Sequence, residues 1–492
     1  MSLILALDQS TSATKAILFE TSGRRVDKAS RDHQQIYPQP GWVEHDAEEI
    51  WRNTLAALKA LLESNRERVK DIACLSITNQ RETCVVFDRA TGKPLHNAIV
   101  WQCRRGAPFC EELMRAGHEE KIRVLTGLKV DTYFSASKLT WLVRNHPDLR
   151  AKLASGEALI GTIDTYLIYR LTSGKVFATD HTNASRTLLY DINKLRWDES
   201  LCALFEVPMR ALPEARDCSA SFGETDLGGL LPHSIPICGV IGDAQASLFA
   251  QRCFQTGEAK ITIGTGSTVM LNLGGTPRFS EGGAVTTVAW AHGGQPTYCF
   301  EGITNYSAAT IEWLKNQLGL IASAKEIGAL AAAVPDNGSV YLVPAFAGLS
   351  APYWKPDARA AIVGLSAHSN RNHVARAAEE SIAYQLRDVI DMMKQDSGVA
   401  LARVQADGGA TGDKFLMQFI ADITGVEVIV SNVSECSPLG AALLGGLGVG
   451  LFASVEQLAS LPRETVAFRR VMSAETVEKN YAGWKQAVQR VL

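Results

Sequence analysis

The amino-acid sequence predicts an α/β protein of two domains that pack around a cleft. Its 492 residues exceed what one ordinary hydrophobic core requires, so two domains of roughly 250 residues are expected. Strand-like and helix-like segments alternate, which is typical of α/β architecture. Each half opens with a strand, a small polar turn and a second strand. Without a Pro-rich or Ser-rich linker as a guide, we place the boundary near residues 245–255, giving domains of residues 1–248 and 249–492.

The N-terminal half begins with a predicted β-hairpin. Leu3–Leu7 and Lys15–Phe19 are apolar runs, and Asp8–Ala13 between them is polar and small. A helix is expected after Asp46, because a Glu follows three residues later and one face then repeats at helical spacing. That face carries Ile50, Thr54, Leu58 and Leu61. The next predicted strands are Ile72–Ile77 and Thr83–Phe87, with a turn at Thr91-Gly92 after them.

The C-terminal half repeats this opening. Lys260–Ile263 and Val269–Leu273 are predicted strands on either side of the turn Gly264–Thr268. A long amphipathic helix follows later, since Ile382, Leu386, Val389, Ile390 and Met393 form one apolar stripe. The uncharged run Ser437–Val455 is long enough to suggest a membrane span. Its initial Pro438 and its glycines instead favour a buried helix followed by a loop.

Composition indicates a globular protein of the reducing cytoplasm. Hydrophobic residues make up 46% and charged residues 21%, and the formal net charge is −3, so the basic surplus of a nucleic-acid-binding protein is absent. The opening MSLILALDQS lacks the basic region of a secretory signal. Ten cysteines at irregular spacing, without a C-x-x-C pair, are expected to be buried free thiols rather than disulfides or zinc ligands.

Three small polar turns have the composition of phosphate-binding loops. They are Asp8–Ser12, Gly264–Thr268 and Asp407–Gly412. Backbone N–H groups in such turns can converge on phosphate oxygens, although a turn of this kind is often only a reversal of the chain. The chain has neither a Walker-type P-loop nor G-x-G-x-x-G after a strand, so a nucleotide site would be of another kind. Asp8 could hold Mg²⁺ through water or simply cap its turn.

Charged residues interrupt apolar segments at two places. Arg81 and Glu82 stand between two predicted strands, and Asp243 follows the apolar run Ile235–Ile241. In one interpretation Arg81 donates to, and Glu82 accepts from, the hydroxyls of a vicinal diol, while Asp243 takes the proton of a hydroxyl nucleophile. In the alternative, Arg81 and Glu82 face opposite ways with one in solvent, and Asp243 is an ordinary turn residue.

Together these segments resemble the FGGY family of carbohydrate kinases, and within it the glycerol kinases, over essentially the whole chain. Tyr133–Asn145 matches the family's first signature position by position. Gly364–Glu380 approaches the second, with Glu379 where an apolar residue is usual. The segments most similar to glycerol kinases are Gly41–Asp46, Ile77–Thr83, Ile99–Arg105 and Gly348–Trp354.

The resemblance implies two actin-like (ribonuclease-H-like) domains flanking a central cleft, with phosphoryl transfer from ATP to a small polyol such as glycerol. Asp8 would lie near Mg²⁺, which it would hold through water, and Asp243 would be the catalytic base. The residues implied to contact the polyol are Arg81, Glu82, Trp101, Tyr133, Asp243, Ala244 and Thr268. Those implied to contact ATP are Thr11, Ser12, Ala13, Lys15, Thr265, Ala308, Glu312, Gly409 and Asp413.

Several positions depart from the residues usual in the family. Lys15 stands where Arg is usual, Ser10 where Gly is usual and Asp413 where Asn is usual. Ala244 and Thr268 stand where Gln and Phe are usual, and both belong to the implied substrate pocket. The smaller side chains leave open a four-carbon polyol or short ketose, such as erythritol, threitol or erythrulose, as the acceptor.

A hypothesis from another class is an actin-like ATPase without a small-molecule acceptor. A kinase differs from such a protein in having a second polar site, and Arg81, Glu82, Tyr133 and Asp243 would supply it. A chaperone of this fold would add a peptide-binding domain, for which the length leaves no room. A small-polyol kinase that forms a homo-oligomer, either a dimer or a tetramer, is therefore the expectation from the sequence.

Overall fold

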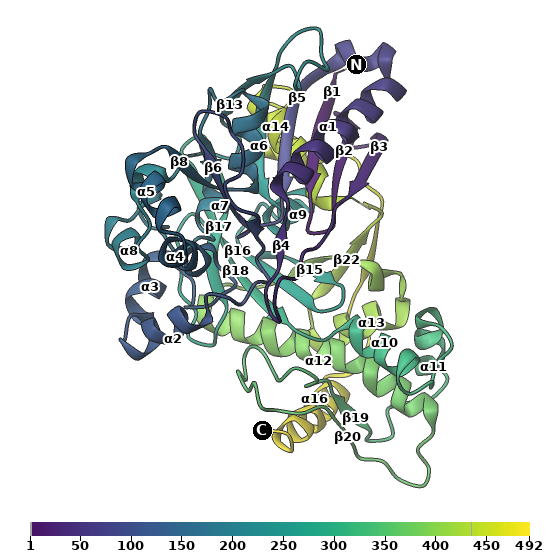
Figure 1. The fold of residues 1–492 in the computed structure, drawn as a ribbon. Helices are drawn as coiled ribbons and strands as arrows, with labels where there is room; N and C mark the ends of the chain where they lie inside the picture. Colours follow the sequence, from purple (N-terminus) through teal and green to yellow (C-terminus); the bar gives the residue numbers. More distant parts are fainter. Residues whose placement is uncertain (1, 434) are drawn as a thin grey trace.

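Two large β-sheets, one in each half, organise the chain in the computed structural model, which describes residues 2–433 and 435–492 (Figure 1). The first sheet has, in spatial order, β13 (Ser221–Thr225), β14 (Ile235–Gly242), β5 (Ile72–Asn79), β1 (Leu3–Gln9), β2 (Ala13–Glu20) and β3 (Arg25–Asp32). The second has β17 (Val285–His292), β18 (Gln295–Thr304), β16 (Ser267–Gly274), β15 (Glu258–Ile263), β21 (Arg403–Asp407), β22 (Glu427–Ser431) and β23 (Thr465–Phe468).

The central strands of the two sheets pair in the same order and directions, which confirms the repeat that the sequence indicates. In the first, β1 pairs antiparallel with β2 and parallel with β5, and β5 pairs parallel with β14. In the second, β15 pairs antiparallel with β16 and parallel with β21, and β21 pairs parallel with β22. An antiparallel strand closes each outer edge, β13 beside β14 and β23 beside β22. The predicted hairpins are therefore the first two strands of each sheet.

The first half also contains a smaller sheet and a group of helices. The sheet consists of β4 (Glu44–His45), β7 (Ala98–Ile99), β6 (Cys84–Asp88) and β8 (Ala158–Thr162). The helices are α1 (Ala47–Ser64), α2 (Ala107–Arg115), α3 (Glu119–Thr126), α4 (Ser135–Asn145), α5 (Pro147–Ser155), α6 (Ile163–Leu171), α7 (His181–Ala184) and α8 (Glu199–Leu204). Asp46 caps α1 as predicted, since its side chain accepts from the Glu48 N–H, and the predicted face of α1 is buried.

Helices of the second half cover its sheet and reach the first. They are α10 (Ala308–Asn316), α11 (Ile327–Ala332), α12 (Arg371–Ser397), α13 (Lys414–Thr424), α14 (Cys436–Gly448), α15 (Val455–Ser460) and α16 (Ala474–Gln489). The predicted apolar stripe of α12 is buried. The run from Ser437 is the predicted buried helix, α14, followed by a loop. Among the described residues, no helix is long and apolar enough to cross a membrane.

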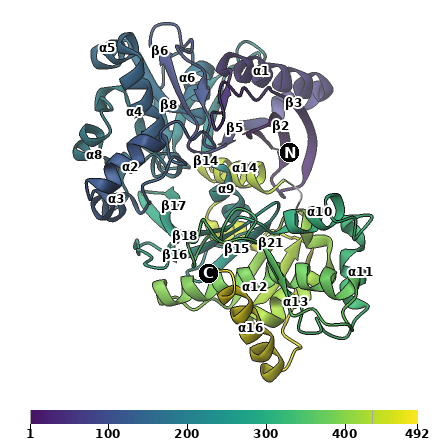
Figure 2. The same ribbon diagram turned by 60° about the horizontal axis from the view of Figure 1, so that its bottom comes forward.

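The two halves share an apolar core. α9 (Asp243–Ala250) and α14 lie between the sheets (Figure 2). One cluster of buried side chains joins Ile4 of β1, Met270 of β16 and Leu444 of α14. α14 belongs to the second half in sequence but packs on β1, β5 and β14, so the division into residues 1–248 and 249–492 stays a prediction.

The structure corrects the predicted first turn and supports the reading of the cysteines. Asp8 pairs with Lys15 inside the β1–β2 ladder, so the connection is only Ser10–Ser12 and not Asp8–Ala13. The pairing therefore places Asp8 in the sheet. All ten cysteines are free thiols, and all except Cys436 are buried, as predicted.

Candidate active site

The carboxyl ends of three adjacent parallel strands gather the charged residues of the first half. β14, β5 and β1 lie side by side, and Asp8 stands opposite Thr78 near the ends of β1 and β5. Arg81 follows the end of β5, and Asp243 follows the end of β14, where Gly242 stands opposite Asn79. The carboxyl ends of parallel strands are where open α/β sheets bind ligands. Residues distant in sequence therefore meet at one edge.

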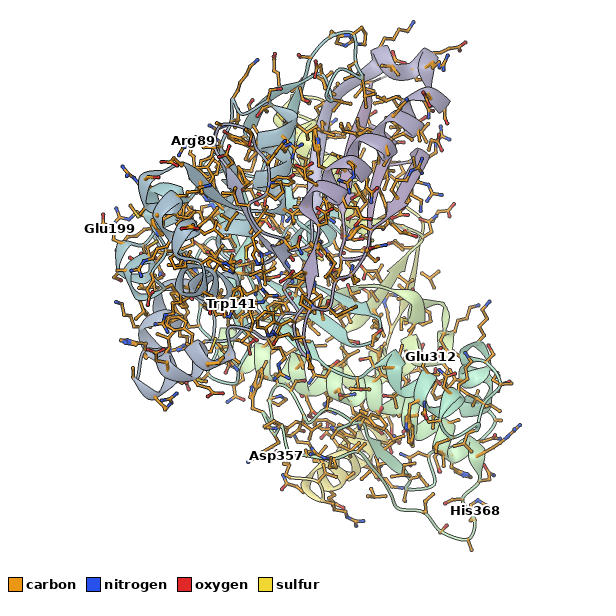
Figure 3. All side chains as sticks on the ribbon, in the orientation of Figure 1. Arg89, Trp141, Glu199, Glu312, Asp357 and His368 are labelled. Carbon is orange, nitrogen blue, oxygen red and sulfur yellow. The ribbon has the colours of Figure 1, made fainter. Side chains whose placement is uncertain are left out.

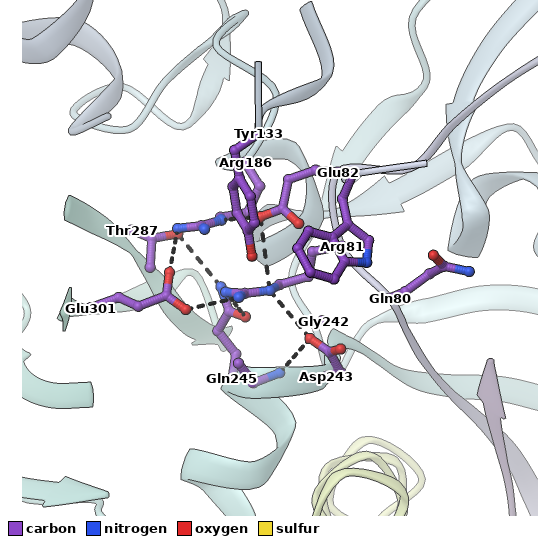
Figure 4. A network of polar contacts seen from close by, with 12 residues as sticks. Gln80, Arg81, Glu82, Tyr133, Arg186, Gly242, Asp243, Gln245, Thr287 and Glu301 are labelled. Atoms are coloured by element: carbon purple, nitrogen blue, oxygen red, sulfur yellow. Dashed lines mark hydrogen bonds and ion pairs between the residues drawn. The ribbon is translucent and has the colours of Figure 1, made fainter. Parts of the chain in front are cut away.

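Arg81 lies at the centre of a buried network of charges (Figure 4). Its guanidinium donates to Glu301 Oε1 at 2.8 Å and to Gln245 Oε1 at 3.1 Å, and its Nε lies 3.2 Å from Asp243 Oδ1. The Arg186 Nε donates to Glu82 Oε1 at 2.6 Å, and the other end of Arg186 lies 2.7 Å from Glu301 Oε2. Arg81 is only 6% exposed and Glu82 only 1%, which excludes the alternative that one of them faces solvent.

The network sets the protonation of its carboxyl groups. Burial raises the pKa of Glu301, but the ion pairs with Arg186 and Arg81 outweigh burial and bring it to about 2, so Glu301 stays ionised. Burial raises the pKa of Glu82, and Arg186 and Arg81 offset only part of that rise. The pKa of Asp243 is likewise raised by burial and partly lowered by Arg81. Because 40% of its side chain remains accessible, Asp243 can still exchange a proton with a ligand.

The substrate residues predicted from the resemblance lie beside Arg81. Lys138, fully buried on α4, donates to the carbonyls of Thr132, Tyr133 and Phe134 and so fixes the segment before the helix. Ser135 donates to the Glu82 carbonyl at 2.9 Å.

The ring of Tyr133 packs edge-on against that of Trp101, with centroids 5.3 Å apart, and the Trp101 indole N–H donates to Thr11 Oγ1. Trp101 thus joins this group to the first turn.

A cavity of about 440 Å³ opens between the two halves in front of Arg81. From the first half it is lined by Asp8, Lys15, Arg81, Asp243 and Ala244; Lys260, Thr268, Asp407 and Glu435 are among those that line it from the second half. The lining includes Ala244 and Thr268, the two positions where a smaller side chain replaces the Gln and Phe that are usual in the family. Glu82, Trp101 and Tyr133 are not part of this lining.

The residues around Asp8 fit a magnesium ion held mainly through water. Burial raises the pKa of the Asp8 carboxyl, and Lys15, 3.1 Å away, partly offsets that rise. Asp243 and Asp407 supply further oxygen atoms to the same cavity, and oxygen ligands are those that Mg²⁺ prefers. Within the described residues no three acidic, Cys or His side chains lie close enough to enclose a metal. Mg²⁺ commonly keeps several waters and few protein ligands, which agrees with this arrangement.

A second and larger cavity lies entirely in the second half. Its volume is about 950 Å³, and it is lined by the turns after β15 and β21 and by α10, α11, α12 and α13. The structure brings Thr265, Ala308, Glu312, Gly409 and Asp413 to this one cavity. Glu312 projects from α10 (Figure 3). All five are predicted ATP-contacting residues, whereas Thr11 and Ser12 lie in the first turn, and Ala13 and Lys15 in β2, of the first half.

Backbone geometry fixes the two turns of the second half. The N–H groups of Ser307 and Ala309, at the start of α10, donate to the Thr265 carbonyl. Gly408 has a φ of +102°, and a Cβ there would lie 2.3 Å from the Ile263 carbonyl oxygen. Only glycine permits the β21 turn to approach β15 so closely. The two turns therefore form a single small-residue surface at the mouth of the second cavity.

Sequence reasoning missed Arg186, Gln245 and Glu301. Glu301 stands within the apolar strand β18, in the run Tyr-Cys-Phe-Glu-Gly-Ile, and a charge inside such a run is the same signal that singled out Arg81. Arg186 follows the short helix α7, where the sequence has no apolar pattern to make a charge conspicuous. Gln245 could be recognised only from its contact with Arg81.

We expect Glu301→Gln to lower kcat/KM for the acceptor by about 10- to 100-fold, because it breaks a buried ion pair that orients Arg81. Arg81, released from Glu301, would pair more strongly with Asp243. The acid limb of the pH profile of kcat/KM should then move to lower pH, which a loss of folding alone would not produce. Glu112→Gln, in an exposed pair with Arg144, is the control and should change kcat/KM less than about threefold. If the acid limb of the pH profile did not shift in Glu301→Gln, Glu301 would not be a residue that orients Arg81.

Comparison with known proteins agrees with this geometry. Residues 3–250 match the N-terminal domain, and residues 259–449 the C-terminal domain, of the FGGY family of carbohydrate kinases. A protein named glycerol kinase 1 from Thermotoga maritima is 47% identical over 99% of both chains. A glycerol kinase from Carboxydothermus hydrogenoformans is 48% identical over 99% of this chain and 97% of its own.

Solved structures give the same result. A crystal structure of Plasmodium falciparum glycerol kinase with ADP superposes with a TM-score of 0.96 and 37% identity, covering 100% of this chain and 98% of its own. A gluconate kinase from Lactobacillus acidophilus has a TM-score of 0.88 at 19% identity, covering 99% of this chain and 97% of its own, which shows a shared fold.

Proposed function

The chain belongs to the FGGY family of carbohydrate kinases, and we propose that it transfers the γ-phosphoryl group of ATP to a terminal hydroxyl of glycerol, forming glycerol 3-phosphate. The observation that carries this proposal is the cavity between the halves, which Asp243, Arg81 and Lys15 line together with residues of the second half. Full-length similarity to proteins named glycerol kinase supports glycerol as the acceptor.

In the proposed reaction, the second cavity binds the base and ribose of ATP, and the turn at Thr265 directs the phosphates toward the first cavity. The acceptor oxygen attacks the γ-phosphorus, the bond from that phosphorus to the ADP oxygen breaks, and Asp243 takes the hydroxyl proton. Its raised pKa makes Asp243 a better base than an ordinary aspartate would be. Lys15 lines the same cavity, where its ammonium can neutralise phosphate charge.

The acceptor is held by the network around Arg81. We propose that Arg81 and Tyr133 contact its hydroxyls, with Trp101 against its carbon atoms. Arg186 occupies Oε1 of Glu82, so Oε2 is the oxygen that would accept from a substrate hydroxyl. A Mg²⁺ ion near Asp8 would supply charge neutralisation for the phosphates when bound. Ala244 and Thr268 would form the outer wall of the acceptor site.

An ADP-release assay over a panel of acceptors tests this function. Glycerol should give the highest kcat/KM among glycerol, dihydroxyacetone, erythritol, threitol, erythrulose and common ketopentoses. Release of ADP at the same rate with and without any acceptor would instead support an actin-like ATPase.

The small side chains of Ala244 and Thr268 favour activity on a four-carbon polyol or ketose as a second candidate. Both line the cavity beside Asp243, and polar space of this kind holds water that one more hydroxymethyl group can displace. We expect the wild type to phosphorylate at least one of erythritol, threitol and erythrulose. The double variant Ala244→Gln with Thr268→Phe should lose that activity while activity on glycerol holds or rises. No four-carbon turnover by the wild type at high substrate would exclude a widened acceptor site.

We also propose that the protein is cytoplasmic and that it forms a homo-oligomer, either a dimer or a tetramer. The ten free cysteines support a reducing compartment. Sedimentation of the purified chain measures the oligomeric state.

A further inference from the structure

Two carboxyl groups lie side by side in the wall of the second cavity. Glu379 of α12 and Asp413, the residue before α13, both line it, and their carboxyl groups are within hydrogen-bonding reach of each other. Glu379 is 1% exposed, and its buried Oε2 has no hydrogen-bond partner among the described residues. The remaining wall is largely apolar, formed by side chains such as Ile311, Ile327 and Ile382. A buried polar atom without a partner in such a wall points to a ligand group.

Asp413 is held rigidly in this position. Its Oδ1 accepts from the N–H groups of Phe415 and Leu416 and so caps α13. On the other side it packs on Gly328 of α11, where a Cβ would come within 2.3 Å of Oδ2. The carboxylate therefore cannot turn away from Glu379 without losing the cap.

No cation neutralises Glu379 within the described part of the cavity wall. Arg376, one turn before Glu379 on α12, forms an ion pair with Glu380 at 2.7 Å. Its guanidinium also donates to the Val334 carbonyl. The other charged residues of the lining are Glu312, Lys325 and Lys414, all of them exposed. Burial raises the pKa of Glu379 to about 10, and the neighbouring Asp413 contributes to this rise. Glu379 is therefore a neutral acid at pH 7.

We propose that the Glu379–Asp413 pair contacts the base of the bound nucleotide and selects adenine by accepting a hydrogen bond from its exocyclic amino group. Guanine and hypoxanthine present a carbonyl oxygen where adenine has the amino group, so they would place two acceptors face to face. This inference rests on the proposed nucleotide site and names the residues that choose its base.

Binding of nucleoside diphosphates without an acceptor tests the inference. Calorimetry with ADP and with purine riboside 5′-diphosphate, which lacks only the amino group, should show ADP binding about tenfold or more tightly. Glu379→Leu fills the apolar wall but removes the acceptor, so the two ligands should bind within about threefold of each other. Glu379→Gln keeps both a carbonyl acceptor and an N–H donor and should retain most of the preference for ADP.

Controls separate base recognition from folding and from the proposed function. Asp391→Asn removes a carboxylate from the same helix at an accessible pair with Arg387 and should leave the preference unchanged. Thermal melts of all variants verify folding, and Glu379→Gln remains informative if Glu379→Leu does not fold. Binding of ADP with no preference in the wild type, or an unchanged preference in Glu379→Leu, overturns the inference alone. Absence of ADP binding overturns the inference together with the proposed function.

Discussion

Asp243→Asn is expected to lower kcat for glycerol phosphorylation by about 10²- to 10⁴-fold, the usual contribution of a positioned general base. The amide has nearly the shape of the carboxylate, but it cannot accept the hydroxyl proton. Arg81 would lose its charged partner at 3.2 Å yet keep Glu301 and Gln245, so the network should stay folded. Steady-state ADP release measures kcat, and calorimetry should give the same affinity for ADP as in the wild type.

The pH dependence gives a second readout for Asp243. In the wild type, kcat/KM should fall as the pH drops through the pKa of Asp243, at a higher pH than for an ordinary aspartate because burial raises that pKa. The variant should lack this acid limb. Asp226→Asn, an exposed turn residue that accepts from the Gly228 N–H, is the matched control and should change kcat less than about twofold. A fall in kcat of less than about tenfold in Asp243→Asn would contradict its assignment as the base.

Arg81→Lys is expected to lower kcat/KM for glycerol by about 100-fold, although the positive charge is kept. The planar guanidinium reaches Glu301, Gln245 and Asp243 at once, and a lysine ammonium cannot span all three. Glu301, held ionised by its two arginines, would lose one of them inside the protein. Kinetics at saturating ATP measure the change, and the affinity for ADP should stay the same.

The control for Arg81→Lys is Arg144→Lys, which changes a half-exposed arginine paired with Glu112 and Glu206. Its effect on kcat/KM should stay within about threefold, because exposed pairs contribute little. An unchanged kcat/KM in Arg81→Lys would mean that the charge alone suffices and that the orientation of the guanidinium is not needed. A loss of ADP affinity would point to misfolding of the cleft rather than to the acceptor.

Local patterns were sufficient for much of the secondary structure. The hairpins β1–β2 and β15–β16, the Asp46 cap of α1 and the buried stripe of α12 follow from apolar spacing and turn composition, which act over a few residues. The first turn was predicted too long, because the polar character of Asp8 concealed its place in the ladder opposite Lys15. Side-chain polarity and backbone pairing are separate properties, and only the second defines where a strand ends.

The candidate site likewise has residues that the sequence indicated and residues that only the structure revealed. The sequence by itself determined that Asp8, Arg81, Glu82 and Asp243 are charges in apolar surroundings, and that two turns of the second half could hold phosphates. It did not reveal that Glu301 and Arg186 complete the network around Arg81, because both are distant in sequence from Arg81 and neither lies in a motif.

The sequence suggested the strand–turn–strand repeat of the two halves, and it determined the chemical types of the residues at the strand ends and the family to which they belong, since these depend on order and spacing along the chain. Only the tertiary structure decided which charges pair, which carboxyl groups lie side by side and which half supplies each part of the cleft. The side-by-side placement of Glu379 and Asp413, more than thirty residues apart, arises where α12 packs on α13. The ionisation of a buried carboxyl depends on its distance to other charges and to water, and those distances exist only once the chain has folded.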